Sequence, residues 1–127
     1  MTVHRLLFAV LWGLTFTAQA QATLGANEPP IFDAARLGSA AEVDKILKAS
    51  PAMRDARNQL GSTPLHLAAT NADSGPLKAL IAAGADVNAK STGGRTPLSL
   101  ARKSRADETA GIISLWVLKG CKPGKPC

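Results

Sequence analysis

A motif that recurs after 33 residues limits what this chain can fold into. Residues 63–69 (TPLHLAA) return as residues 96–102 (TPLSLAR), and a glycine precedes each copy at the same distance. A third, degenerate copy lies upstream, where residues 34–38 (AARLG) align with residues 68–72 at an offset of 34. Repeats of this length are typical of solenoids, in which each unit buries its apolar face against its neighbours.

The residues inside each copy predict helices. Thr63 and Thr96 are suitable N-cap residues, and the prolines that follow them, Pro64 and Pro97, suit the first turn, where a missing N–H costs nothing. The alanine pair at 68 and 69 allows a neighbouring helix to approach closely.

Downstream residues predict a second helix and then a turn. Leu77, Leu80 and Ile81 form an apolar stripe at helical spacing, and Gly84 stands where a residue with positive φ can end a helix. Gly61 and the pair at 93–94 supply turn conformations between units. Each unit is therefore expected to be a helix, a turn, a second helix and a hairpin.

These motifs resemble the ankyrin repeat family. Gly61, residues 63–66, the alanine pair and residues 84–89 (GADVNA) match its signature closely in the middle copy. The resemblance covers residues 31–120 and implies an all-α solenoid of about three helix-turn-helix units joined by β-hairpin turns, at about 31–57, 58–90 and 91–120. It also implies that Thr63 and His66 hydrogen-bond and connect adjacent turns. The first copy lacks Thr-Pro, and the third has Ser99 and Arg102 in place of His and Ala, so we expect these two units to cap the stack.

The last helix is strongly apolar, and we expect it to close the core. The residues that carry this expectation are Ala110, Ile112, Ile113, Leu115, Trp116 and Leu118. Asp107 and Glu108, just before them, are expected at a solvated turn.

The N-terminus has the pattern of a secretory signal peptide. Arg5 precedes an apolar run from residue 6 to residue 16, and Ala18-Gln19-Ala20 is a small-residue cleavage pattern. We expect cleavage after Ala20, a linker over residues 21–30, and a periplasmic or secreted protein; an uncleaved anchor is the alternative. Cleavage would leave 14 basic and 9 acidic residues, a net charge of +5.

Residues 121–127 form a basic tail that holds the two cysteines. Pro123-Gly124 between Cys121 and Cys127 favours a turn, so a disulfide between these cysteines is expected in an oxidising compartment. A redox or metal-binding pair, or a bond between two chains through Cys127, is the alternative.

The side chains of catalysis are scarce. The chain has no Tyr, and His66 would be the only histidine left after cleavage. No Gly-rich phosphate loop, metal-ligand cluster or oriented triad is evident, so we expect no enzyme activity, no cofactor and no metal. The basic residues are not interleaved with aromatic ones, which argues against nucleic-acid binding.

The family resemblance implies a partner-binding concave face made by hairpin tips and inner helices. Carried over by position, that face comprises Arg36, Leu37, Gln59, Leu60, Ser62, Thr70, Asn71, Lys90, Thr92, Arg95, Lys103 and Ser104. Four of these residues are basic and none is acidic, which favours a protein partner with an acidic surface. We expect a monomeric accessory factor that binds a periplasmic partner. One alternative is an immunity or inhibitor protein that neutralises an exported toxin or hydrolase. Another is binding of anionic lipid or wall polymer through tail lysines 119, 122 and 125.

Overall fold

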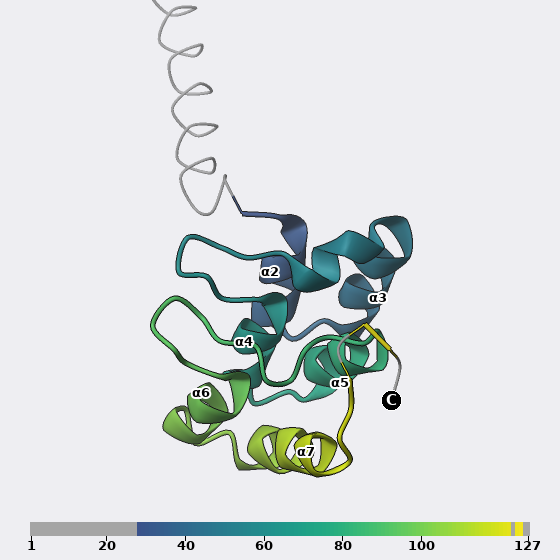
Figure 1. Ribbon diagram of the computed structural model, residues 1–127. Coiled ribbons are helices and arrows are strands. Elements are labelled where there is room, and N and C mark those ends of the chain that lie inside the picture. The colour runs from purple at the N-terminus through teal and green to yellow at the C-terminus, as the bar shows by residue number, and fades with distance from the viewer. Residues whose placement is uncertain (1–27, 123, 126–127) are drawn as a thin grey trace, which may run out of the picture.

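Three pairs of helices are stacked side by side in the computed structural model, which describes residues 28–122, 124 and 125 (Figure 1). The elements are α2 (Pro30–Leu37), α3 (Ala40–Ala49), the 3₁₀ helix η1 (Pro51–Asp55), α4 (Pro64–Ala69), α5 (Gly75–Ala82), α6 (Pro97–Lys103) and α7 (Asp107–Leu118). The described part of the chain contains no strand. The expected all-α solenoid is confirmed, and the signal peptide expected at residues 1–20 lies outside the described residues.

The inner helices α2, α4 and α6 form one row, and α3 and α5 pack beside each other in the outer row. Two long loops between the pairs project to one side of the stack (Figure 1). Two backbone hydrogen bonds close each loop like a hairpin. In the first loop they run from Asn58 N–H to the Ser62 carbonyl (3.0 Å) and from Gly61 N–H to the Asn58 carbonyl (2.9 Å). In the second loop they run from Ser91 N–H to the Arg95 carbonyl (2.9 Å) and from Gly94 N–H to the Ser91 carbonyl (2.9 Å). We call residues 56–63 the first hairpin loop and residues 89–96 the second.

Local capping explains why the inner helices begin where they do. Thr96 Oγ1 accepts a hydrogen bond from Ser99 N–H (3.2 Å), and Ser99 Oγ accepts one from Thr96 N–H (3.0 Å). Thr63 holds the same N-cap position before α4, followed by Pro64 in the first turn. These exchanges satisfy backbone donors that a helix N-terminus leaves free.

The core runs through all three pairs. Ile31 and Phe32 of α2 are fully buried, and so are Leu65 of α4 and the alanines that face neighbouring helices. The apolar stripe predicted at residues 77, 80 and 81 is buried. Burying this surface between units is the main source of stability in a stack of this kind.

Gly84 ends α5 as the sequence predicts. Its φ is +91°, its N–H bonds to the Ile81 carbonyl (2.9 Å), and the next N–H, of Ala85, reaches the Leu80 carbonyl (3.0 Å). The C-terminal tail returns to this point: Gly124 N–H donates to the Gly84 carbonyl (2.9 Å). The tail therefore runs from α7 back past α5 (Figure 1).

The last helix, α7, closes the core only in part. Ile113 is buried, and Ala110, Ile112 and Trp116 pack partly against the core. Leu115 and Leu118, however, are 60% and 83% exposed, because no described element covers the outer side of α7. Their expected place in the core was wrong. The neighbouring acids Asp107 and Glu108 form the first turn of α7 rather than a separate turn.

Candidate partner-binding groove

A groove of about 570 Å³ opens between the two hairpin loops and the inner helices α4 and α6. Its lining residues are Gln59, Leu60, Ser62, Leu67, Thr70, Ser91, Thr92, Gly93, Arg95 and Leu100. Leu60 is 71% exposed, and both Leu67 and Leu100 are partly buried in the floor. The groove therefore offers apolar surface with a polar rim, which is the usual composition of a protein interface.

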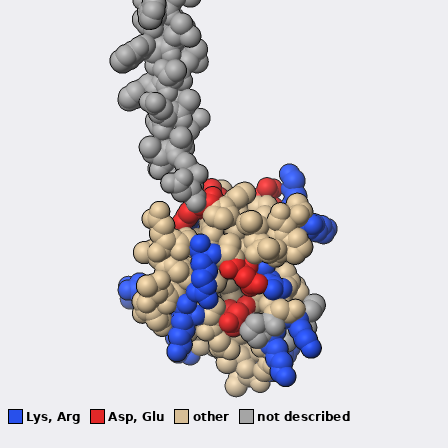
Figure 2. Space-filling view, turned by 45° about the horizontal axis from the view of Figure 1, so that its top comes forward, with Lys and Arg blue, Asp and Glu red and all other residues tan. Residues whose placement is uncertain are grey.

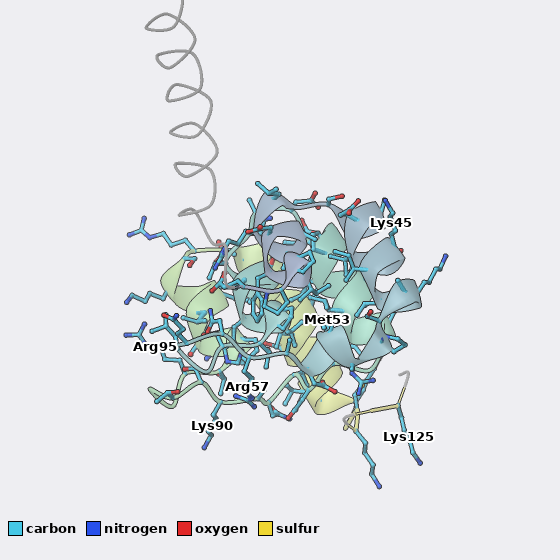
Figure 3. All side chains as sticks on the ribbon, turned by 90° about the horizontal axis from the view of Figure 1, so that it is seen from above. Lys45, Met53, Arg57, Lys90, Arg95 and Lys125 are labelled. Atoms are coloured by element: carbon cyan, nitrogen blue, oxygen red, sulfur yellow. The ribbon has the colours of Figure 1, made fainter. Side chains whose placement is uncertain are left out.

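Arg57 fixes the two hairpin loops to each other. Its Nη1 donates to the carbonyl oxygens of Gly61 (2.7 Å) and Lys90 (2.8 Å), so one guanidinium bridges both loops. Thr92 N–H adds a bond to the Leu60 carbonyl (3.1 Å). Figure 3 shows Arg57 beside Lys90, with Arg95 on the same side of the molecule. The rim of the groove is thus held in place before any partner arrives.

The buried side chain of His66 connects the start of α4 to the second hairpin loop. Its Nδ1 accepts a hydrogen bond from Thr63 N–H (3.1 Å) and lies 2.9 Å from Thr63 Oγ1, while Nε2 lies 2.9 Å from the Arg95 carbonyl oxygen. Since Nδ1 is an acceptor, Nε2 must carry the proton that bonds to Arg95. The expected role of Thr63 and His66 in connecting adjacent turns is confirmed.

Burial lowers the pKa of His66, and the nearby positive charge of Arg57 acts in the same direction. The hydrogen bond to the Arg95 carbonyl works against this shift without cancelling it. A neutral imidazole fits this bonding pattern.

Six of the twelve predicted face residues line the groove: Gln59, Leu60, Ser62, Thr70, Thr92 and Arg95. The other six lie outside its lining: Arg36, Leu37, Asn71, Lys90, Lys103 and Ser104. Of these, Lys90 is in the second hairpin loop and the rest are at the C-terminal ends of the inner helices. Asn71 Nδ2 donates to the Arg36 carbonyl (3.1 Å), which links the first two of these helix ends.

Three residues of the predicted concave face, rather than four, carry a positive charge that no acid of the described chain neutralises. Arg36 forms ion pairs with Glu28 (2.5 Å) and Asp33 (3.2 Å). Lys90, Arg95 and Lys103 form no ion pair with any described residue, and all three side chains are exposed. In Figure 2, basic side chains project from several parts of the visible face, on both sides of it, and acidic ones lie near its middle and at its top.

Sequence reasoning missed part of the groove. Leu67 and Leu100 occupy equivalent positions 33 residues apart, so the repeat could have identified them as floor residues. Ser91 and Gly93 of the second hairpin loop were also missed. No local pattern marks Arg57, because its acceptors lie 4 and 33 residues away.

A second hollow of about 370 Å³ lies behind the hairpin loops and is lined by Arg54, Asp55, Arg57 and Asp86 among others. Its arginines are already satisfied: Arg54 binds Asp55 and the Ala83 carbonyl, and Arg57 binds the loops. The two arginines and the two aspartates that line this hollow therefore offset each other in charge. Among the described residues no group of three or more His, Cys, Asp or Glu is placed to hold a metal ion.

The expected disulfide joins Cys121 to Cys127, and Cys127 lies outside the described residues. Cys121 is half-buried just after α7. Within residues 28–122, 124 and 125, no helix has the length and apolar character needed to cross a membrane.

Stacked helix pairs, paired hairpin loops and a groove between them define a solenoid interaction module. The family model for ankyrin repeats (3 copies) matches residues 30–122, and the chain belongs to this family. Ankyrin repeats generally bind other proteins and are typically not enzymes.

One curated relative is alpha-latrocrustotoxin-Lt1a from Latrodectus tredecimguttatus, which is 40% identical over 81 residues. The match covers 63% of this chain but only 6% of the toxin's length.

Proposed function

We propose that this protein is an exported, non-enzymatic accessory factor that binds an acidic surface of a periplasmic partner through the groove. The observation that carries the proposal is the pairing of an exposed apolar residue with unpartnered cations. Leu60 offers an anchor in the groove, and Arg95 lies on its rim with no ion-pair partner among the described residues.

The basic residues of the predicted concave face favour a partner with an acidic surface. Lys90, Arg95 and Lys103 would repel a basic surface and speed encounter with an acidic one. The arrangement of the loops, fixed by Arg57 and His66, reduces the ordering that binding requires. A folded protein with an acidic, partly apolar patch fits these properties.

The test is affinity capture from an envelope extract, with the captured proteins identified by mass spectrometry. The full chain is compared with Arg95→Glu/Lys103→Glu, in which both substituted side chains are exposed. The charge-matched control is Lys45→Glu/Lys48→Glu on the outer face of α3. A protein retained by the native chain and the control, and lost with Arg95→Glu/Lys103→Glu, supports the proposal. Equal capture by all three contradicts it.

The same groove would serve the alternative role of neutralising an exported toxin or hydrolase. Deletion of the gene separates the two roles. A partner that loses activity or stability indicates an accessory factor, whereas a partner that becomes toxic indicates an immunity or inhibitor protein. Salt-sensitive binding to anionic vesicles that survives the groove substitutions would instead indicate the tail lysines.

A further inference from the structure

The second hairpin loop repeats the turn of the first. Gly61 N–H bonds to the Asn58 carbonyl (2.9 Å), and 33 residues later Gly94 N–H bonds to the Ser91 carbonyl at the same distance. The φ angles of the two glycines, +68° and +72°, also agree. The two loops therefore share one conformation, and each presents equivalent backbone groups on the edge that faces the C-terminal end of the stack.

The first loop shows what this edge binds. Its Leu60 carbonyl accepts a hydrogen bond from Thr92 N–H of the second loop (3.1 Å), and Arg57 donates to the Lys90 carbonyl of that loop (2.8 Å). The approach is so close that a Cβ added to Gly61 would lie 2.8 Å from the Thr92 nitrogen. A stretch of backbone with a free carbonyl and, two residues later, a free N–H is therefore what the edge of a hairpin loop accepts.

The corresponding edge of the second loop is exposed. Gly93 takes the place of Leu60, and no described residue donates a hydrogen bond to its carbonyl. Lys90 takes the place of Arg57, and its exposed side chain forms no ion pair within the described chain. Apart from its chain neighbours, nothing lies within 4 Å of a Cβ added to Gly94. No third hairpin loop follows in the described part of the chain (Figure 1). We call Lys90, Gly93 and Gly94 the free loop edge.

The last unit is not built to receive another helix pair. Leu65 and Ala69 are fully buried in the middle unit. Their equivalents in the last unit are Leu98, which is half-buried, and Arg102, which is exposed. A large cation therefore stands where a close helix contact needs a small residue. A further unit, or the helices of a second copy stacked on this end, would have to bury Arg102 without a partner, which is unfavourable.

The charges beside the free loop edge favour an acidic segment. Lys90 and Arg95 belong to the same loop and lie on the same side of the molecule (Figure 3), and both are exposed without an ion pair in the described chain. The same edge of a second copy would bring like charges together, which is repulsive. An exposed carbonyl beside a cation suits a ligand that carries a donor and an anion, and a peptide with an acidic side chain supplies both.

We propose that the free loop edge binds an acidic loop of another protein, which lies along it as the second hairpin loop lies along the first. A backbone N–H of that loop donates to the Gly93 carbonyl, and an acidic side chain pairs with Lys90. Main-chain bonds of this kind supply affinity, and the side chains beside them supply specificity. The proposal does not rest on the proposed function, because the apolar anchor of the groove, Leu60, belongs to the first loop.

A peptide made from the second loop itself tests the proposal. The probe is a head-to-tail cyclic peptide with the sequence of residues 89–96 and the changes Lys90→Asp and Arg95→Asp. It is titrated at low salt into isotope-labelled protein, expressed from the full sequence and purified as the cell leaves it, and the backbone amide signals are followed by NMR. We expect saturable shifts of the Gly93 and Gly94 signals, with a dissociation constant of about 1 mM or lower.

Two altered probes test the chemistry of the contact. Methylation of the probe's backbone nitrogen at the position of Thr92 removes the N–H that should reach the Gly93 carbonyl. This change should raise the dissociation constant at least about tenfold, since it also leaves the carbonyl without a partner. A probe with the unaltered sequence keeps Lys90 and Arg95 and should also bind at least about tenfold more weakly, because it is basic.

Two asparagine variants of the protein locate the site. Asparagine tolerates a positive φ, so Gly94→Asn should fold. Its side chain would fill the space that Thr92 occupies beside Gly61 in the first loop, and the dissociation constant should rise at least about tenfold. Gly93→Asn places the same side chain where the first loop has Leu60, and should leave the constant within about threefold. Leu60→Ser removes the anchor of the groove and should not affect the probe, so failure of the groove and failure of the edge are distinguishable.

Three results overturn the proposal. One is the absence of any saturable shift up to about 5 mM probe, since an ion pair and main-chain bonds should give measurable binding below that concentration. Another is a methylated probe that binds as tightly as the unmethylated one. The third is binding that Leu60→Ser abolishes and Gly94→Asn leaves intact, which would place the probe in the groove.

Discussion

His66 Nε2 lies 2.9 Å from the carbonyl oxygen of Arg95, 29 residues further along the chain. The bond connects the first turn of α4 to the second hairpin loop, and the same imidazole also holds Thr63. One buried side chain therefore sets the position of a helix start in one unit and of a loop in the next. Arg95 in turn lies on the rim of the groove, so His66 also fixes part of the proposed binding surface.

Replacement of His66 should cost much of the stability of the stack. His66→Ala leaves the Thr63 N–H without its partner, removes one of the two hydrogen bonds to the Arg95 carbonyl and opens a small void. Together these losses should lower the free energy of unfolding by about 2–3 kcal/mol. Urea unfolding followed by circular dichroism measures this. The control is Ser99→Ala at the equivalent position of the next copy, which is exposed and bonds only to Thr96. A cost at Ser99 as large as that at His66 would show that the long-range bond contributes nothing.

The lowered pKa of His66 predicts how stability depends on pH. In the unfolded chain a histidine binds a proton near pH 6.5, whereas the folded state resists protonation at Nδ1. The contribution of His66 is therefore fully present above about pH 6.5 and is lost as the pH falls from there through the folded pKa. Urea unfolding at a series of pH values should show this loss in the native chain and a smaller one in His66→Gln. Parallel curves for the two proteins would contradict the prediction.

Gly84 should tolerate a side chain poorly. Its φ is +91°, and an added Cβ would lie 3.0 Å from Lys125 N and 3.2 Å from Arg54 Nη1. Gly84→Ala should lower the free energy of unfolding by about 1–3 kcal/mol through backbone strain and crowding against the tail.

Two matched variants separate these causes. Gly94 has a φ of +72° with open space around it, so Gly94→Ala reports the cost of backbone strain alone. Gly93 has open space, and no positive φ is found there, so Gly93→Ala should be nearly neutral. If Gly84→Ala costs no more than Gly94→Ala, the tail does not pack on Gly84.

The cysteine pair remains a prediction that mass spectrometry can test. If Cys121 and Cys127 form a bond within the chain, the unreduced protein has the mass of one chain and gains two alkyl groups only after reduction. Cys121→Ser should then lower the free energy of unfolding by roughly 2 kcal/mol, as expected for a short closed loop. Alkylation of the unreduced protein would contradict the intramolecular bond.

Helix positions could be predicted because their signals are local. Thr96, Pro97 and Ser99 lie within one turn, and the exchange of hydrogen bonds between Thr96 and Ser99 follows from those residues alone. The same is true of Gly84, whose positive φ ends α5.

Long-range contacts could not be predicted in this way. Leu115 and Leu118 have the apolar character of core residues, and only the arrangement of the helices shows that their side of α7 is uncovered. The charge of the concave face was overestimated for the same reason, since Glu28 and Asp33 neutralise Arg36.

Photo-crosslinking from the groove tests the central claim most directly. A crosslinking amino acid is placed at Gln59, an exposed lining residue, and for comparison at Lys45 on α3, which Figure 3 shows on the opposite side from Arg95. Irradiation of living cells followed by mass spectrometry identifies what each position touches. A protein joined to the Gln59 variant but not to the Lys45 variant is the predicted result. No crosslinked protein, or the same set from both positions, would contradict a binding function for the groove.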